Sequence, residues 1–417
     1  MMIEMKESGI TWVGNIPKHW NFNKAKYHFT NDKYVVGVKS ANYNRLALTL
    51  KGVIHRKKED NEGLQPNDFN TYQLLKTGEL VFKLIDLQNV STSRVGLAHD
   101  TGIVSPAYII LHANNDINPA YAEKFFLMMW HREIFNALGD AGVRSNLNAG
   151  DLLNVFIPVP PLKEQNKIAD FLDEKCAEID SISAEIQEQI DTLEEYKKSV
   201  ITEAVTKGLN PNAEMKDSGI EWIGQIPKGF EIKRIKHIGI YRNGLTYSPT
   251  ETVDEKDGTL ILRSSNVQNG KIVLDDNIYV SSSIPKRLMV QKDDILICSR
   301  NGSRELIGKN AIIENDMIAS FGAFMMIYRC VSPKYMYYIL NSNIFSYYLG
   351  SFFTSTINQL TGSNFGNMKI VYCNDISSQN EIIDYLDSKC LKIDGAIQDK
   401  QKQLEILDEY KKTLIYE

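Results

Sequence analysis

The stretch from Pro161 to Val205 constrains the fold of this chain most, because no glycine and no second proline interrupts it. From Ile179 onward its apolar residues are spaced by threes and fours, as in the seam of a coiled coil. Roughly 43 helical residues at 1.5 Å each predict a rod of about 65 Å. Such a helix cannot bury its own apolar stripe and therefore needs a partner. The seam is predicted at Ile168, Leu172, Ile179, Ile182, Ile186, Leu193, Tyr196 and Val200.

The same chain supplies a candidate partner for this helix. At a shift of 214 positions, residues 378–417 repeat it, so that Gln165 falls on Gln379 and Cys176 on Cys390, with about half of the aligned positions identical. Lys400 and Gln403 stand where apolar residues would seal the second seam. If the helices pair, we expect these polar positions to set their register at some cost in stability.

A second repeat shows that the whole chain is duplicated. Residues 5–20 (MKESGITWVGNIPKHW) match residues 215–230 (MKDSGIEWIGQIPKGF) at 10 of 16 positions with a shift of 210. Each copy therefore consists of an entry motif, a globular segment and a long helix. The glycines of the motif predict turns, and its Ile-Pro pairs disfavour helix. Its tryptophans, Trp12, Trp20 and Trp222, are interpreted as anchors on an apolar surface rather than as binding residues.

The globular segments have the composition of mixed α and β domains. β-branched and aromatic runs predict strands, and apolar periodicity predicts a helix after them. The predicted strands are 79–84 and 107–111 in the first copy and 294–297 and 323–328 in the second, followed by helices at 119–138 and 333–349. The sequences of the two segments differ although the entry motifs and helices match. This plan indicates two α+β domains that do one job on two different targets.

Composition narrows the class of protein. With 417 residues the chain is long enough for two or three domains, and no apolar run approaches the 18 residues of a membrane span. Five cysteines without a CxxC pair indicate reduced thiols in the cytoplasm. Residues 161–209 carry 6 basic against 12 acidic side chains, whereas residues 231–375 carry 16 against 13. A polyanion is therefore expected on the globular segments and not on the helices.

Motifs for catalysis are missing from the sequence. There is no G-x-x-x-x-G-K-[ST], no G-x-G-x-x-G after a strand and no Asn/Asp-Pro-Pro-aromatic run. The seven histidines show no metal-ligand spacing. Asp173-Glu174-Lys175 imitates the end of a nuclease carboxylate motif but lies inside the long helix. We expect neither a catalytic site nor a cofactor or metal in this chain.

Polar and basic loops are the better candidates for a functional site. Arginine, asparagine, glutamine and serine read base edges in the major groove and also hold phosphates. Solvated loops without a ligand are the competing interpretation, and for the turn at Arg56-Lys57, which is followed by acidic residues, the two are equally plausible. The candidate DNA-binding residues are Arg144 and Asn146 in the first copy, Arg263, Asn266, Arg300, Asn301 and Arg304 in the second, and Arg56 and Lys57 as phosphate contacts.

Three features together resemble the specificity subunit of type I restriction–modification systems. They are the motif S-G-I-x-W-x-G-x-I-P at 8–17 and 218–227, the stretch P-P-L-x-E-Q-x-x-I-x-x-F-L-D at 160–173, and two divergent lobes in tandem. Two departures are visible: the second helix opens without prolines, and the chain stops at Glu417, sooner than family members usually do. Weaker helix pairing is expected at that end.

The resemblance implies a non-catalytic subunit that recognises DNA. Each lobe would be a target recognition domain that reads half of a split site in double-stranded DNA, and the long helices would pair antiparallel as a spacer one to two DNA turns long, at roughly 34 Å per turn. Two methyltransferase subunits using S-adenosylmethionine and translocase–endonuclease subunits using ATP and Mg would carry the chemistry, in the cytoplasm of a bacterium or archaeon, associated with the nucleoid. The expected domains are 1–160 (first lobe), 161–209 (central helix), 210–375 (second lobe) and 376–417 (C-terminal helix).

Two other functions fit parts of the sequence. A self-contained methyltransferase or nuclease with fused recognition domains would need a catalytic domain, and the duplicated plan leaves no stretch for one. A coiled-coil scaffold for protein interactions would explain the helices but not two divergent lobes with polar loops. Binding of S-adenosylmethionine by the isolated chain would favour the first alternative, and failure to select a bipartite DNA site would favour the second.

Overall fold

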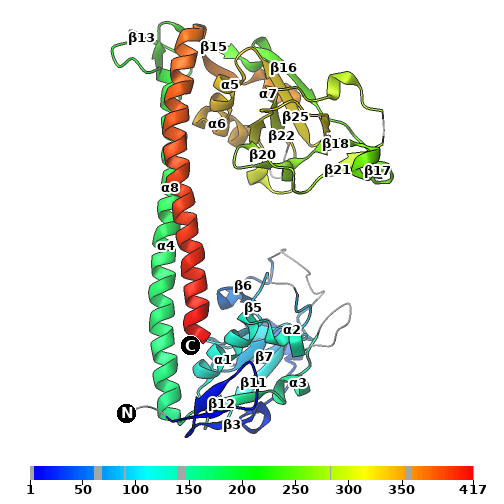
Figure 1. Cartoon of the computed structure of the whole chain (residues 1–417), viewed down its shortest axis with the longest axis vertical. Coiled ribbons are helices and arrows are strands. Elements are labelled where there is room, and N and C mark those ends of the chain that lie inside the picture. The colour runs from blue at the N-terminus through cyan, green and yellow to red at the C-terminus, as the bar shows by residue number, and fades with distance from the viewer. Residues whose placement is uncertain are drawn as a thin grey trace. The chain divides into compact units, whose positions relative to one another are not determined.

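The computed structural model describes residues 4–60, 68–88, 91–138, 146–281, 283–352 and 359–416. The chain divides into two compact units, Met1–Ile186 with Lys402–Glu417, and Gln187–Gln401. Each unit contains one lobe together with parts of both long helices (Figure 1). Among the described residues, no helix is both long and apolar enough to cross a membrane.

The first lobe is built on two four-stranded sheets, with strand orders β6-β5-β10-β7 and β4-β11-β8-β9. The strand β8 is buried along its whole length, which explains its continuous apolar sequence. The strands are β1 (Met5–Glu7), β2 (Asn15–Pro17), β3 (Asn21–Lys24), β4 (Phe29–Thr30), β5 (Arg45–Thr49), β6 (Gly52–Arg56), β7 (Gln73–Leu75), β8 (Leu80–Phe82), β9 (Val95–Leu97), β10 (Gly102–Val104), β11 (Ile109–Ala113) and β12 (Phe156–Val159).

The second lobe also contains two four-stranded sheets, with orders β17-β21-β18-β24 and β16-β25-β22-β23. Its strands are β13 (Met215–Asp217), β14 (Gln225–Pro227), β15 (Phe230–Arg234), β16 (Gly239–Asn243), β17 (Thr252–Val253), β18 (Thr259–Leu262), β19 (Val267–Gln268), β20 (Lys271–Ile272), β21 (Ile278–Val280), β22 (Ile295–Cys298), β23 (Asn310–Ile312), β24 (Ala319–Phe321), β25 (Met325–Cys330) and β26 (Lys369–Cys373).

The two lobes repeat one strand plan. The order β4-β11-β8-β9 corresponds element by element to β16-β25-β22-β23, and the pairs are antiparallel in both. The parallel pair β5–β10 corresponds to β18–β24. Each lobe also contains a small two-stranded sheet, β3–β12 in the first and β15–β26 in the second, whose last strand leads into the long helix. The expectation of two related α+β lobes is thereby confirmed.

The helix predicted after the strands is broken in both lobes. In the first lobe α1 (Pro119–His131) ends at Arg132, α2 (Ile134–Leu138) follows, and Glu133 between them has a positive φ of 56°. In the second lobe α5 (Pro333–Leu340) and α6 (Asn343–Phe352) meet at a similar break. The short helices α3 (Ala149–Leu153) and α7 (Gly362–Asn367) precede β12 and β26.

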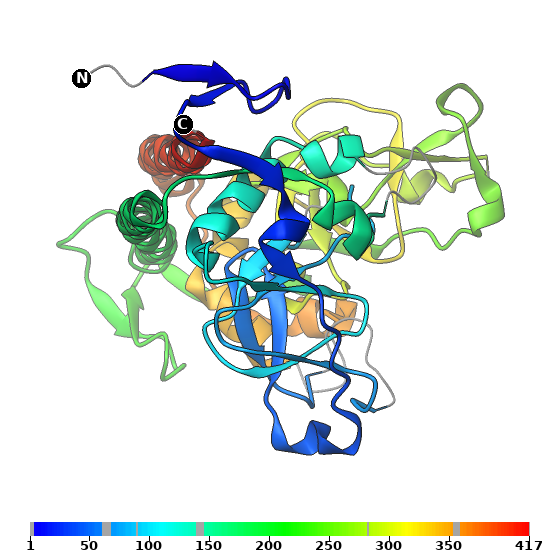
Figure 2. The same ribbon diagram turned by 90° about the horizontal axis from the view of Figure 1, so that it is seen from below.

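The long helices are α4 (Leu162–Lys207) and α8 (Ile376–Tyr416). Their contacts run antiparallel within each unit. In the first unit Lys411 Nζ lies 2.5 Å from Asp180 Oδ1, and in the second Lys197 Nζ lies 2.6 Å from Asp394 Oδ1. Lys400, one of the two polar positions of the second seam, donates to Gln189 of the facing helix. The helices also lie next to each other in the views of Figures 1 and 2.

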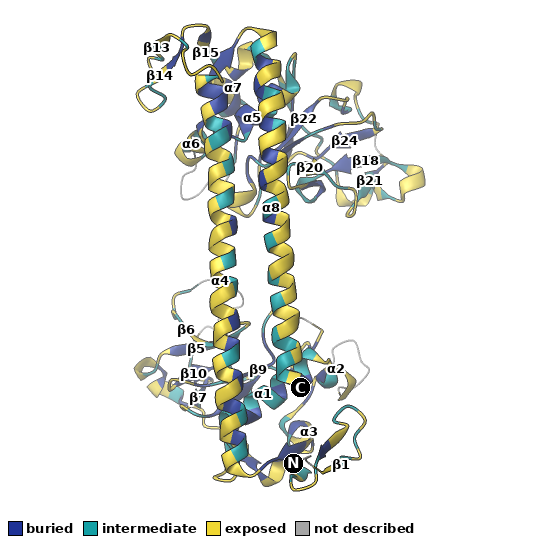
Figure 3. Ribbon diagram, turned by 60° about the vertical axis from the view of Figure 1, so that its left-hand side comes forward, coloured by how far each residue is buried: buried dark blue, intermediate teal, exposed yellow. Residues whose placement is uncertain are grey.

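The predicted seam of α4 is only partly correct. Leu172 and Ile179 are buried, but Ile182 and Tyr196 are 46% and 52% exposed. Ile190, which lies outside the predicted seam, is buried instead. A two-helix pair covers a narrower stripe than the sequence pattern offers, so apolar residues at its margins stay exposed (Figure 3).

The entry motif is a β-hairpin in both copies, formed by β1 with β2 and by β13 with β14 in the same register shifted by 210 positions. Its turn glycines adopt positive φ angles, 77° at Gly9 and 71° at Gly219. Trp12 packs 6.0 Å from Phe125 of the first lobe, and Trp222 stacks 4.2 Å from Tyr347 of the second. The interpretation as structural anchors is thereby confirmed for Trp12 and Trp222, while Trp20 Nε1 donates to Glu164 Oε2 at 2.9 Å.

Candidate DNA interface

In the second lobe, polar turns that are distant in sequence meet at the ends of β18, β22 and β24. Asn301 Nδ2 donates to Ser264 Oγ at 3.1 Å, which joins the turns after β22 and β18. Leu360 N donates to Ser299 O at 2.7 Å, which brings the segment before α7 to the same place. The two predicted polar loops thus join the segment before α7 in one surface cluster, which we call the second-lobe turn cluster and which comprises residues 263–266, 299–304, 322–324 and 359–360.

Arg300 and Arg304 lie on the exposed side of this cluster. The Arg300 guanidinium stacks over the ring of Phe324 at 5.1 Å from its centroid, which limits the freedom of a long side chain. Arg304 begins a short 3-10 helix, Arg304–Leu306. Asn301 is half-buried, and its amide connects the turn internally. The cluster therefore presents guanidinium groups on a defined platform, which suits base edges or phosphates.

Arg263 and Asn266 are placed differently from what the sequence predicted. Asn266 is fully buried, accepts a hydrogen bond from Arg263 N at 2.8 Å and donates one to Val273 O at 3.0 Å. It shapes the loop, and in this conformation its amide does not reach a ligand. The Arg263 guanidinium is paired with Asp276 at 2.7 Å and is only 30% exposed. The pattern of residue types could not separate such internal roles from surface ones.

In the first lobe, Asn146 occupies the place that Gln359 has in the second. Its Oδ1 accepts a hydrogen bond from Asp86 N at 3.0 Å, and the next residue, Leu147, donates through N to Leu84 O at 2.9 Å. The latter bond is the counterpart of the one between Leu360 and Ser299. Arg144, the other residue predicted here, lies outside the described residues.

The turn after β8 depends on Arg94, a residue that the sequence did not single out. Arg94 is 1% exposed, and its guanidinium donates to the carbonyl oxygens of Lys83 at 3.3 Å, Ile85 at 3.3 Å and Asp86 at 2.6 Å. Burial lowers the pKa of this guanidinium, and nearby Asp86 opposes that effect. A single arginine in a polar stretch gave no signal of burial, because arginine is mostly exposed in proteins.

The structure does not bring Arg56 and Lys57 to the turn after β8. Arg56 lies opposite Arg45 at the start of β5, whereas the turn that corresponds to residues 263–266 follows the end of that strand. The Arg56 side chain is bound to Asp60 through Nε at 2.8 Å, while Lys57 is exposed. In the described part of the chain, no group of three or more His, Cys, Asp or Glu side chains is arranged to hold a metal ion.

Residues 22–192 match the family model described as the type I restriction modification DNA specificity domain. Over these residues the chain is similar to the DNA specificity domain of type I restriction–modification systems. Two curated relatives support this similarity: the type I restriction enzyme MjaVIII specificity subunit of Methanocaldococcus jannaschii is 26% identical over 63% of this chain and 60% of its own length, and the EcoKI specificity subunit of Escherichia coli is 30% identical over 42% and 36%. The matches thus span about three fifths or less of these two specificity subunits.

The fold of this chain also matches a solved structure. That structure, described as "Structural basis underlying complex assembly and conformational transition of the type I R-M system", contains a chain that superimposes with a TM-score of 0.66. The match covers 96% of this chain and 97% of the other at 14% sequence identity. At that identity the likeness concerns the fold alone, and it agrees with the α+β plan of two lobes and two long helices.

Proposed function

We propose that this chain is the DNA-recognition subunit of a type I restriction–modification complex, in which each lobe reads one half of a bipartite site. The observation that carries the proposal is the repeated strand plan with different turns. The turns after β8 and β22 hold equivalent backbone hydrogen bonds to Leu147 and Leu360 but expose different side chains. Two domains that recognise different DNA sequences need the same scaffold with different polar side chains in its turns.

The chemistry of the complex is assigned to other subunits. Two methyltransferase subunits with S-adenosylmethionine and translocase–endonuclease subunits with ATP and Mg would modify and cleave the DNA, while this chain binds no cofactor and catalyses no step. The acidic faces of α4 and α8 suit these protein partners better than DNA. The paired helices act as the spacer between the readers. The complex is expected in the cytoplasm, on the nucleoid.

Within the second lobe, Arg300, Asn301 and Arg304 are the residues that we place at the DNA. Arg300 is the sharpest choice because the ring of Phe324 fixes its direction. A bidentate arginine–guanine contact contributes about 1–3 kcal/mol of discrimination, or roughly tenfold to a hundredfold. In the first lobe Asn146 is retained, and Arg144 remains a sequence-based proposal.

The test compares Arg300→Ala with Arg287→Ala in the complex assembled from the full chain and its methyltransferase subunits. Arg287 is an exposed arginine that precedes β22 and is distant in sequence from its turn. Bound duplexes are selected from a randomised pool and sequenced. Arg300→Ala should relax one half-site and leave the other half-site and the spacer unchanged, and Arg287→Ala should preserve both.

Two results would contradict the proposal. Equal weakening of both half-sites, or of neither, would show that Arg300 does not read a base in one half. If the unmodified complex selected no bipartite sequence at all, the chain would be a protein scaffold, and recognition of DNA would have to be abandoned.

A further inference from the structure

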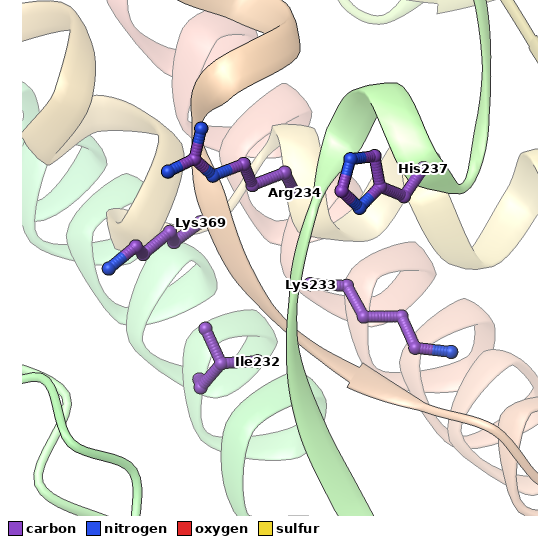
Figure 4. Close-up of a pocket in the computed structure, with 5 residues that line it drawn as sticks. All are labelled: Ile232, Lys233, Arg234, His237 and Lys369. Carbon is purple, nitrogen blue, oxygen red and sulfur yellow. The ribbon is translucent and has the colours of Figure 1, made fainter.

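A cationic pocket lies at the base of the second lobe, apart from the turn cluster. Its volume is about 440 Å³, and it is formed by β15, by the 3-10 helix Ile235–His237 and by the first residue of β26 (Figure 4). Four of its five lining residues can carry positive charge. The lining consists of Ile232, Lys233, Arg234, His237 and Lys369.

The strand register places two of these charges opposite each other. Arg234 of β15 and Lys369 of β26 are direct cross-strand partners. In Figure 4 their side chains extend toward the same side of the sheet. Like charges at directly opposed positions destabilise a sheet. The arrangement is therefore unfavourable in the free lobe, and an anion bound between the two side chains would relieve the repulsion.

The described neighbours compensate little of this charge. Arg234 Nη1 and Lys236 Nζ both donate to Asn367 Oδ1, at 3.0 and 2.9 Å, and this oxygen is neutral. Lys233 has a carboxylate neighbour, Glu231 at 3.5 Å, which is itself 54% exposed. No hydrogen bond or ion pair of the Lys369 ammonium occurs among the described residues. The pocket thus keeps an excess of positive charge at its surface.

We infer that this pocket grips the phosphodiester backbone of the bound DNA, next to the bases that the turn cluster reads. The inference rests on the proposed DNA recognition and adds an anchoring site to it. The helix α7 connects the two regions: Leu360, just before it, is hydrogen-bonded to Ser299 of the cluster, and Asn367 at its end holds Arg234. Six helical residues span about 9 Å, or roughly three base pairs. One duplex can therefore contact both regions.

The first lobe lacks an equivalent pocket lining at the corresponding strands, as far as its described residues show. There Phe156 takes the place of Lys369, stacks on Phe22 at 5.5 Å, and lies under the Lys24 ammonium at 5.7 Å. The aromatic pair fills the site where the second lobe has its cations. The backbone grip is accordingly assigned to the second lobe, and the two halves of the DNA are held unequally.

The double variant Arg234→Gln/Lys369→Gln tests the inference in the complex with the methyltransferase subunits. Binding to a duplex with the selected bipartite site and to an unrelated duplex is measured at salt concentrations from roughly 50 to 200 mM. Each lost phosphate contact should make the slope of log K against log salt shallower by about 0.9, so the double variant should lose roughly 2 units of slope. Affinity for both duplexes should fall by similar factors, and the selected sequence should stay the same.

Two controls separate charge from structure. Arg234→Lys/Lys369→Arg keeps both charges and should preserve the slope, and Lys292→Gln removes an exposed charge before β22 and should leave the slope unaltered. If Arg234→Gln/Lys369→Gln left the slope of log K against log salt unchanged while the wild type still selected its site, the pocket would not bind the DNA backbone. The proposed DNA recognition would be unaffected by that result. Loss of methyltransferase subunits from the neutral variant without a change in slope would instead assign the pocket to protein docking and overturn the inference. Absence of site selection in the wild type would refute the proposed function itself.

Discussion

The two lobes use arginine in opposite ways on the same strand plan. After β8 of the first lobe, Arg94 points inward and holds three backbone carbonyls of the turn. After β22 of the second lobe, Arg300 and Arg304 point outward. Arg94 thus fixes the shape of the first turn from inside the lobe. The second turn is held instead by the hydrogen bond from Asn301 to Ser264 and by the stacking of Arg300 on Phe324. A scaffold of this kind tolerates different turns because the support for each is local.

A second difference concerns the ion pair at the opposite end of the same strands. In the second lobe Asp294 is completely buried and forms a two-pronged pair with Arg329 at 2.6 and 2.7 Å. The equivalent pair in the first lobe joins Glu79 to His112 at 3.6 Å, with His112 62% exposed. Both lobes have a carboxylate just before β8 or β22. Only in the second lobe is this carboxylate fully buried and therefore dependent on a charged partner, Arg329.

The largest expected effect comes from removing Arg94. Arg94→Met leaves the carbonyls of Lys83, Ile85 and Asp86 without their buried donors, which we expect to destabilise the first lobe by about 3 kcal/mol. Recognition of one half-site should be lost with it. Urea unfolding followed by amide exchange of β8 and β9 measures the first effect, and site selection measures the second.

Lys309 provides the matched control, because its carbonyl accepts a hydrogen bond from Cys298 just as that of Arg94 accepts one from Lys83. Lys309→Met should change the stability of the second lobe by less than about 0.5 kcal/mol, as expected for a side chain without a special structural role. If Arg94→Met and Lys309→Met destabilised their lobes equally, the inward position of Arg94 would not explain how the turn after β8 keeps its shape.

Asp294→Asn should have the next largest effect. It keeps an acceptor for Gln291 N but removes the charge that Arg329 needs, which we expect to cost about 2 kcal/mol. Glu79→Gln, the same change in the first lobe, should cost about 0.5 kcal/mol because its partner is exposed. Amide exchange of β22 and of β8 reports each lobe separately, and equal losses in the two would refute the asymmetry.

Much of the architecture could be predicted from the sequence because repetition reveals it. The hairpins at 5–17 and 215–227, the helix from 162 and its partner from 376 all lie where the two copies match. The break at Glu133 could not be predicted, since its positive φ depends on packing and not on a glycine or proline signal. The exposure of Ile182 and Tyr196 escaped prediction for a similar reason, because periodicity identifies an apolar stripe but not its width.

The candidate interface was predicted less well than the fold. Residue type located the loops that contain Arg300 and Asn301, which tertiary hydrogen bonds then join to Ser264. Residue type could not distinguish Asn266, whose amide is buried and hydrogen-bonded within its own loop, from an asparagine that faces solvent. The burial of Arg94 depends on carbonyl groups 8 to 11 residues away along the chain, which only folding brings together, so the sequence alone gave no sign of it.

A smaller effect is expected where the end of each long helix meets its lobe. In the first unit Arg132 stacks on Tyr416 at 4.3 Å and donates to Trp12 O at 2.8 Å. Arg132→Ala should cost about 1 kcal/mol and increase amide exchange in the last turns of α8. In the second unit Thr202 Oγ1 of α4 accepts from Asn343 N at 2.8 Å, and Thr202→Val should cost a similar amount at that end alone. Faster exchange at the opposite helix end in either variant would contradict local docking.

The smallest effect is a dependence on pH that belongs to the first unit. Burial lowers the pKa of His131 below its ordinary value, and the ammonium groups of Lys412 and Lys411 add to that effect, while Asp408 and Glu409 oppose it. Because the folded state holds the proton more weakly than the unfolded state, stability is complete above the unfolded pKa of about 6.5 and decreases as the pH falls below it.

Between about pH 7.5 and 5.5 we therefore expect the docking of the α8 end to weaken by less than about 1 kcal/mol in the wild type. His131→Gln should abolish this dependence. Amide exchange of residues 408–416, corrected for the intrinsic effect of pH, measures it, and residues 200–207 of α4 serve as the internal reference. An equal change in both helix ends would assign the pH response to the paired helices as a whole, because the charged groups that act on His131 lie at 408–412, near the end of α8.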